Sequence, residues 1–509
     1  ENKSSMKNSV RRIIIAGIGV LIQIIWVVVL LMRLNEYSQI ITLLTVAIEL
    51  VLVLAVYSMD TNAAFKLPWI ILITVAPIVG ICVFFLFGRS GATKKVRARY
   101  RKIDQQLFAY LDQDEQIIEE LSKKDERLAN DFKYLWKCAS SPVYKNTDVK
   151  YYGDTCDAMA AQLEDMMQAK KFIFLEYHAI EMAESFQALR KVLMAKAREG
   201  VEIRILYDDA GCIGFLNPRF IKYMESMGIQ CRVFNPIMPV LNIFMNNRDH
   251  RKITVIDGKV AYTGGYNLAD EYFNITHPYG QWKDSGIRFE GDAVQTATIL
   301  FLEMWNALRE QDVDIEKYLP VYPYKAKEQG FFALYGDSPL DKEPAGENVY
   351  MNLLRHAKKY IYFTTPYLIL SDEMTRELTG AAKRGVDVRI ITPGIPDKKT
   401  IFQVTKSYYP QLLKHGVKIY EYTPGFMHEK QCICDGEIVV VGTINLDFRS
   451  LYLHFENAAL FCGYEAVSHV KEDFDALFPI CKDMSKEPSE RTRRLRLSQL
   501  ILRLFSPLM

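Results

Sequence analysis

A chain of 509 residues is long enough for two or three domains, and a composition of 50% hydrophobic and 24% charged residues is typical of globular proteins. The formal net charge of +2 excludes a global field that would attract a polyanion, although basic residues cluster after the apolar N-terminal region and at the C-terminus. Nine cysteines lack the spacing of a disulfide framework and favour a reducing compartment. Cys432 and Cys434 form a C-x-C pair without matched ligands elsewhere, so we expect no metal site and no cofactor.

The N-terminal region, residues 1–90, is predicted to be a transmembrane helical region. Residues 13–32 and 68–87 are nearly unbroken apolar runs of the length that crosses a bilayer. Residues 40–57 form a third apolar run, which carries Glu49, so the number of spans stays open at two or three. The larger basic cluster follows the last run, which together with the free cysteines predicts a multi-pass membrane protein whose bulk faces the cytoplasm.

The segment 91–140 is polar and free of proline over most of its length, and its apolar residues have helical spacing, which predicts a helical connector. From residue 141 onward, strand-like and helix-like stretches alternate, as in an α/β fold. The last segment, 486–509, interleaves arginine with leucine and isoleucine. It is predicted to be a basic amphipathic segment that either docks on its own domain or lies at a membrane surface.

The α/β part repeats itself. Three stretches of the first half, residues 141–325, return in the same order in the second half, residues 326–485, and the period is far longer than that of a solenoid. The matching pairs are KKFIFLEY (170–177) with KKYIYFTT (358–365), AREGVEIRILYD (197–208) with AKRGVDVRIITP (382–393), and MGIQCRVF (227–234) with HGVKIYEY (415–422). A whole domain is therefore duplicated.

The most informative repeat is HRKITVIDGKVAYTGGYN, from His250 to Asn267, which returns as HEKQCICDGEIVVVGTIN, from His428 to Asn445. Each copy is typical of a hairpin with an Asp-Gly turn, and its His and Lys lie two residues apart, on one face of the entering strand. A duplication kept for folding alone explains the turns and glycines but not the recurrence of His with Lys. One copy offers half a site, and two copies could face each other.

This combination suggests displacement at phosphorus. Two histidines can act as nucleophile and general acid, because imidazole attacks when neutral and donates a proton when charged. Two lysines, helped by the Asn residues, would stabilise the charge on the phosphate oxygens. No metal is required for this chemistry.

At these residues the sequence resembles the phospholipase D superfamily, whose signature is His-x-Lys-x4-Asp with a downstream Gly-Ser-x-Asn, present twice per active site. The family's serine is replaced by Gly265 and Thr443, which puts a hydroxyl contact from the first copy in doubt. The resemblance implies two pseudo-symmetric phospholipase-D-like α/β/α halves that form one composite active site. It also implies an acid in each half that orients a catalytic histidine, for which Asp284 and Glu456 occupy suitable places. The implied catalytic residues are His250, Lys252, Asp257, His428, Lys430 and Asp435, with Asn267, Asn445, Asp284 and Glu456 binding phosphate or supporting the site.

The sequence is more closely similar to the bacterial cardiolipin synthases, through PIVGICVFFLFGR, RDHRKITVIDGKVAYTGGYNLADEY, NLDFRSLYLHFENAALF and the terminal LFSPLM. That resemblance implies a phosphatidyltransferase of the bacterial cell membrane. It would convert two phosphatidylglycerol molecules into cardiolipin and glycerol through a phosphatidyl-histidine, with His250 as nucleophile and His428 as acid and then base.

Two alternatives remain at this stage: a hydrolytic phospholipase D that resolves the same intermediate with water, and a non-catalytic phospholipid-binding membrane scaffold. The expected partners are phosphatidylglycerol, cardiolipin and the lipid bilayer, and a homo-oligomer stays open. No broad basic face with interleaved aromatic residues is evident, so no nucleic acid is expected.

Overall fold

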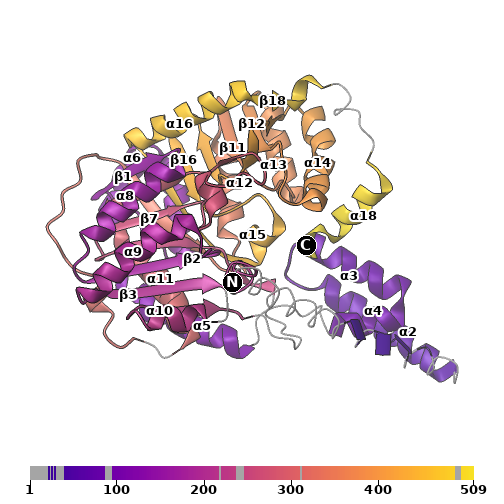
Figure 1. Ribbon diagram of the computed structural model, residues 1–509. Coiled ribbons are helices and arrows are strands. Elements are labelled where there is room, and N and C mark those ends of the chain that lie inside the picture. The colour runs from indigo at the N-terminus through magenta and orange to yellow at the C-terminus, as the bar shows by residue number, and fades with distance from the viewer. Residues whose placement is uncertain are drawn as a thin grey trace.

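The protein is described from a computed structural model, which places residues 39–85, 94–216, 219–236, 246–309, 312–487 and 495–508 and a few positions between 21 and 32. Two sheets with flanking helices form the body, and α2, α3 and α4 project from it beside α18 (Figure 1). The predicted span 13–32 lies largely outside the described residues.

The predicted span 68–87 is wrong as a single helix. α3 (Ala63–Val75) ends at Ala76, whose φ of −136° and ψ of 72° leave the helical region, and α4 (Pro77–Val83) begins at a proline. Proline disfavours helical geometry in the residue that precedes it. α4 then folds back on α3, where Gly80 approaches so closely that a Cβ would lie 2.5 Å from the Leu72 carbonyl oxygen. Over the described residues, no helix is both long and apolar enough to cross a membrane.

α2 (Gln39–Tyr57) covers the third apolar run and packs against α3 and α4. Leu52, Val56, Ile73 and Phe84 form a small buried cluster among these helices. Most of the remaining apolar side chains of α2 face outward, because three short helices cannot bury all of them.

The first half contains a seven-stranded mixed sheet. Its strands lie in the order β1-β9-β7-β6-β2-β3-β4, in which β2, β3 and β4 are parallel and the hairpin β6-β7 is antiparallel. The bounds are β1 (Thr147–Tyr152), β2 (Phe172–Tyr177), β3 (Glu202–Asp208), β4 (Gln230–Phe234), β6 (Lys252–Ile256), β7 (Val260–Gly264) and β9 (Gly286–Gly291).

The second half repeats this order as β10-β17-β16-β15-β11-β12-β13, with β18 added at the edge. Since each strand occupies the place of its counterpart in the first sheet, the duplication predicted from the sequence is confirmed in the fold. The bounds are β10 (Phe331–Asp337), β11 (Tyr360–Thr364), β12 (Asp387–Pro393), β13 (Lys418–Tyr422), β15 (Gln431–Cys434), β16 (Ile438–Gly442), β17 (His454–Cys462) and β18 (Cys481–Asp483).

Helices cover the outer face of each sheet, and the inner faces meet. On the outside, the first sheet buries one apolar cluster against three helices, and the second buries another against three equivalent ones. The former are α8 (Thr155–Met167), α9 (Glu184–Arg198) and α10 (Phe220–Glu225), and the latter are α12 (Ala345–His356), α13 (Asp372–Lys383) and α14 (Lys399–Lys414). α11 (Val294–Leu308) and α16 (Glu465–Leu477) follow the last long strand of each half.

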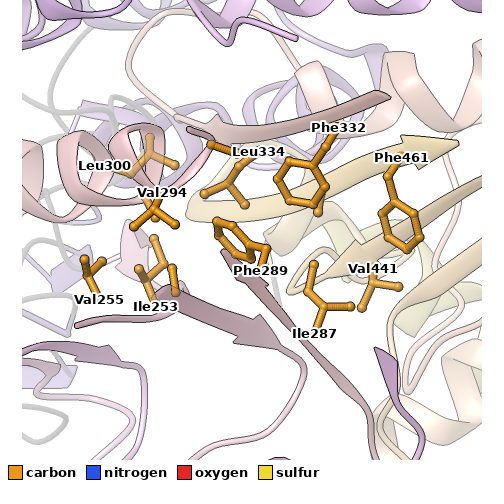
Figure 2. Packing of buried hydrophobic residues seen from close by; sticks show 14 of the residues in the cluster. Ile253, Val255, Ile287, Phe289, Val294, Leu300, Phe332, Leu334, Val441 and Phe461 are labelled. Atoms are coloured by element: carbon orange, nitrogen blue, oxygen red, sulfur yellow. The ribbon is translucent and has the colours of Figure 1, made fainter. Parts of the chain in front are cut away.

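The two halves share one apolar interior. Ile253, Ile287 and Phe289 of the first sheet lie in the same cluster as Val441 and Phe461 of the second (Figure 2). α11 belongs to this cluster and is buried along nearly its whole length. Because burial of this apolar surface stabilises both halves together, their relative position is fixed.

The predicted connector is helical and also belongs to the body. Its helices are α5 (Lys94–Leu107), α6 (Glu115–Lys124) and α7 (Glu126–Ala139). Tyr100, Ile103 and Leu107 of α5 join the shared interior, and α7 packs on α12. The segment is thus part of the shared fold.

Candidate active site

Each repeated motif forms the predicted hairpin. The turns Asp257-Gly258 and Asp435-Gly436 have positive φ at both positions, 53° and 66° in the first and 53° and 71° in the second. This is the turn whose twist matches that of two paired strands, and Asp-Gly is a preferred sequence for it.

The two turn aspartates have a structural role, which corrects the expectation that they are catalytic. Asp257 accepts hydrogen bonds from the backbone N–H groups of Lys170, Lys171 and Phe172 at 2.7–2.9 Å. Asp435 holds the equivalent backbone of the second half in the same way. At roughly 3.3 Å per residue, five strand residues place Asp257 about 16 Å from Lys252, so its carboxylate cannot touch the reacting atoms.

Each half lends a short strand to the other at the site. β5 (Arg248–Asp249) pairs with the start of β17, and β14 (Gly425–Met427) pairs with β8 (Gln281–Lys283). The residues that follow β5 and β14 are His250 and His428. The exchange therefore brings both histidines to the boundary between the halves.

The acids that hold the histidines also come from the opposite half. His250 Nδ1 lies 2.8 Å from Glu456 Oε2, and His428 Nδ1 lies 2.5 Å from Asp284 Oδ2, so each histidine is held by the acid of the other half. All four residues are buried. An Nδ1 that donates to a carboxylate leaves Nε2 as the reactive nitrogen of a neutral imidazole.

Burial controls the protonation of the site. It lowers the pKa of His428 to about 3 and that of His250 well below its usual value. It also raises the pKa of Glu456 well above its usual value, against the opposing effect of Lys252. Both imidazoles are therefore neutral in the empty site.

Two buried lysines complete the charge of the site. Lys252 Nζ donates to the carbonyl oxygen of His250 at 2.6 Å, and Lys430 Nζ donates to that of His428. Burial lowers the pKa of Lys252 to about 8 and that of Lys430 to about 7. An anionic ligand would favour the charged form of both groups.

The positions that replace the family's serine differ in what they do. Thr443 Oγ1 donates to Glu456, whereas Gly265 leaves no room for a side chain, since a Cβ would lie 2.1 Å from Asp284 Oδ1. The hydroxyl contact is thus kept for the acid that holds His250 and lost for the acid that holds His428.

The two motif asparagines have different partners. Asn267 accepts from the Ala179 N–H and donates to the Tyr272 hydroxyl, so it fixes the loop after β7. Asn445 Oδ1 is buried without a hydrogen-bond partner among the residues described. Phosphate binding by these residues stays a prediction.

Sequence reasoning missed two histidines beside His250. The ring of His178 lies 5.0 Å from that of His250, and the ring of His454 lies 5.6 Å from it on another side. Three of the eight histidines in the chain thus gather at one point. Because histidine is scarce in this chain, each one was a candidate for the site. The long separations in sequence hid that His178 and His454 lie beside His250.

The environment of His428 is aromatic instead. Its ring lies 5.1 Å from Tyr272, 5.1 Å from Trp282 and 5.8 Å from Phe426. Trp282 and Phe426 belong to the exchanged pair β8 and β14. The two histidines are related by the repeat but lie in unlike surroundings.

His250, His454 and Glu456 place ligand atoms within 4.8 Å of one another, the arrangement of a possible metal centre. Their hydrogen bonds oppose this. Arg449 Nε donates to His454 Nε2 at 3.2 Å, which places the proton of a neutral His454 on Nδ1, facing Glu456. His250 Nδ1 also donates to Glu456, so neither nitrogen beside the carboxylate offers a lone pair. His454 Nδ1 lies 3.6 Å from Glu456 Oε1 and makes no hydrogen bond with the described residues, so in this tautomer only the carboxylate oxygens offer lone pairs to a metal ion.

Comparisons with known proteins agree with this geometry. The family described as "Cardiolipin synthase, PLD-like domain" matches residues 163–305 and 350–478, more than half of the chain. An uncharacterised protein of Streptococcus mutans is 39% identical over 460 residues, covering 90% of this chain and 99% of its own. A cardiolipin synthase of Halalkalibacterium halodurans is 32% identical over 442 residues, covering 86% of this chain and 87% of its own.

Among solved structures, the phosphatidylserine synthase of Haemophilus influenzae superposes with a TM-score of 0.53 at 13% identity, covering 71% of this chain and 93% of its own. At that identity the likeness concerns the fold. With the duplicated sheets, the crossed His–acid pairs and the match over most of the body, the chain belongs to the cardiolipin synthase family of phospholipase-D-like enzymes.

Proposed function

We propose that this enzyme is a phosphatidyltransferase that makes cardiolipin and glycerol from two molecules of phosphatidylglycerol. The observation that carries the proposal is the pair of buried imidazoles, each oriented by an acid of the opposite half, with a lysine beside each. Cardiolipin synthases of about 31–32% identity over most of the chain support the choice of lipid.

In the first step, the neutral Nε2 of His250 attacks phosphorus and the P–O bond to the headgroup glycerol breaks. His428, in its charged form, gives a proton to the departing oxygen, and glycerol leaves. Lys252 and Lys430 stabilise the charge on the phosphate oxygens as it develops. The negative charge of the bound phosphate raises the pKa of His428 from its low value in the empty site, which makes this donation possible.

In the second step, a headgroup hydroxyl of another phosphatidylglycerol gives its proton to the neutral His428. Its oxygen attacks phosphorus, the P–N bond to His250 breaks, and cardiolipin leaves. The aromatic side chains of Tyr272, Trp282 and Phe426 make the side of His428 poorly hydrated. Such an apolar environment favours a lipid alcohol over water as the acceptor of the phosphatidyl group.

The membrane is part of the proposal. Leu43, Val51 and Leu54 on α2 are 72%, 65% and 66% exposed, far more than large apolar side chains in a water-facing helix require. α18 (Leu497–Phe505) packs on α14 and α3, and its Leu497, Leu500 and Ile501 point outward. We place the exposed apolar side chains of α2 and α18 against the bacterial cell membrane, with the two halves on the cytoplasmic side.

The test uses the purified full-length protein in vesicles that contain phosphatidylglycerol. We expect cardiolipin and glycerol in equal amounts by lipid mass spectrometry. Phosphatidic acid without cardiolipin would identify a hydrolytic phospholipase D instead. Vesicle binding without any product would identify a non-catalytic scaffold.

The roles of the two histidines are tested by quenching turnover of phosphatidylglycerol labelled in its acyl chain with neutral denaturant, which preserves both the P–N bond and the acyl esters. His428→Ala should form label on His250 slowly, because the acid for the departing glycerol is lost, and should retain it, because the base for the second step is lost as well. His250→Ala should retain none. Label on His428 in the His250→Ala variant would reverse the assignment.

A further inference from the structure

A groove of about 630 Å³ lies where the N-terminal helices meet the second half. Its volume is in the range of small-molecule sites. One wall is formed by the end of α2 and the start of α3, and the other by the end of α15 (Phe448–Tyr452) with Leu453. None of the residues assigned to catalysis above lines it.

Specific contacts join the two walls of the groove. Asn62 Nδ2 donates to the Tyr452 hydroxyl at 3.1 Å, and the Phe65 ring packs edge-on against Phe448 and Tyr452 at 5.6 and 5.5 Å. Lys342 forms an ion pair with Asp60 at 3.6 Å across the rim. The N-terminal helices and the catalytic body therefore share a built cavity.

The lining changes in character along the groove. Val56, Phe65 and Trp69 supply apolar surface on the side of the N-terminal helices, whereas Asn246 and Asn247 supply polar atoms on the side of the body. Charged side chains also line it, and Lys342 pairs with Asp60; they are the cations Lys66, Arg97 and Lys342 and the acids Asp60, Glu343 and Glu347. A molecule with a long apolar part and a polar headgroup matches this lining.

The apolar part of the groove continues into the face placed against the membrane. α2 and α3 line it with Val56 and Trp69 and expose Leu54 and Ile71 outside it. A hydrocarbon chain that left a bilayer along these helices would stay in contact with apolar side chains. Each methylene kept from water makes that route more favourable.

The polar end of the groove lies three residues along the chain from His250. Asn247 Nδ2 donates to the Leu453 carbonyl oxygen at 2.9 Å, and β5 follows directly, with the His250 N–H donating to the Phe455 carbonyl oxygen at 2.8 Å. Three residues of extended chain span roughly 10 Å. The groove thus ends about one lipid headgroup away from the reacting histidine.

We propose that this groove binds an acyl chain of a phospholipid substrate while the headgroup of that lipid reaches the site at His250. The inference rests on the proposed function for the identity of the lipid, since the groove itself specifies only a long apolar chain beside a polar group. The N-terminal helices would then bind substrate in addition to contacting the membrane.

The kinetic test uses two substitutions that fill the groove from its two ends, Leu453→Trp and Met59→Trp. The matched control is Met167→Trp, on the exposed end of α8. Both filled variants should raise the KM for dioleoyl-phosphatidylglycerol at least tenfold. Their kcat/KM for dihexanoyl-phosphatidylglycerol should stay within twofold of the unaltered protein, because short chains do not need the groove. An unchanged KM for the long-chain lipid, or equal losses on both lipids, would overturn the inference.

A binding test needs no turnover. Phosphatidylglycerol with a diazirine near the end of one acyl chain is photolysed with the full-length protein in vesicles, and adducts are mapped by mass spectrometry. We expect adducts within 56–69 and 451–453 that Leu453→Trp removes; adducts confined to 43–54 would refute the groove. Adducts in the groove without cardiolipin formation would instead refute the proposed function alone.

Discussion

His250 and Glu456 are 206 residues apart in the chain, yet His250 Nδ1 lies 2.8 Å from Glu456 Oε2. Their counterparts His428 and Asp284 are related in the same crossed manner. Neither half can therefore orient its own histidine, and the active site exists only when both halves are packed together.

Glu456→Gln should lower kcat by roughly 100-fold or more, with a smaller effect on KM. The amide cannot hold the Nδ1–H tautomer as a carboxylate does, and such partners are worth this much in comparable sites. Steady-state kinetics with vesicle-bound substrate measures the effect. Glu437→Gln, at the exposed turn beside Gly436, is the control and should leave kcat unchanged; equal activity of the two variants would contradict the role of Glu456.

Gly265→Ala should reduce kcat at least about tenfold, because moving a supporting partner of a catalytic histidine costs this much. The added Cβ would lie 2.1 Å from Asp284 Oδ1 and must displace the carboxylate that holds His428. Gly380→Ala on α13 is the matched control, since its Cβ meets nothing closer than 3.8 Å. A crystal structure of the Gly265→Ala variant should show Asp284 turned from His428, and wild-type kinetics would argue against the steric account.

Alkaline pH should weaken substrate capture. Burial lowers the pKa of Lys430 to about 7 and that of Lys252 to about 8, so in the free enzyme these charges are present below those values and lost as pH rises through them. Since kcat/KM reports the free enzyme, it should fall about tenfold or more between about pH 6.5 and 8.5.

Lys430→Arg keeps its charge throughout that range. Whatever activity the variant retains should lack the lower step of the pH profile, near pH 7. A wild-type kcat/KM that stays level from about pH 6.5 to 8.5 would show that the lysines are charged throughout.

Asp435→Asn should destabilise the fold by about 1–3 kcal/mol, the range for weakening hydrogen bonds made by a charged group. The carboxylate accepts from three successive backbone N–H groups of the second half, and asparagine tolerates the positive φ of 53°. Denaturant titration of the detergent-solubilised protein measures the change, with Glu437→Gln as the control at the same turn. Below the unfolding transition kcat should be close to normal; a large loss of kcat in the folded variant would return Asp435 to the catalytic set.

Leu54→Trp should report contact with lipid. Leu54 is 66% exposed on α2, whereas Met167 is 50% exposed on α8 of the first half. In vesicles with brominated acyl chains, the fluorescence added by Leu54→Trp should be quenched and that added by Met167→Trp should not. Equal quenching, or none in either variant, would exclude the membrane face assigned to α2.

The local features of this protein could be predicted from the sequence because they depend on neighbouring residues. An Asp-Gly pair between two β-rich runs specifies a tight hairpin turn, and the spacing of His and Lys places both on one face of a strand. The recurrence of the motif that ends at Asn267 and Asn445 showed the duplication, and the resemblance to the phospholipase D superfamily implied the candidate acids Asp284 and Glu456. It did not show that the acids exchange partners, since a repeat specifies equal halves and not how they pair.

Three features were decided only by the tertiary structure. The break of the run 68–87 at Ala76 has a local cause in Pro77, but the return of α4 onto α3 depends on their packing, which an average of hydropathy along the chain does not register. Asp257 accepts hydrogen bonds from the backbone at the start of β2, because the length of β6 separates it from Lys252. His178 and His454 reach His250 only through strand pairing between distant segments. The sequence by itself predicted the reacting groups. The packing of two sheets through one apolar interior decided which acid holds which histidine, because only burial of that shared surface brings the exchanged strands together.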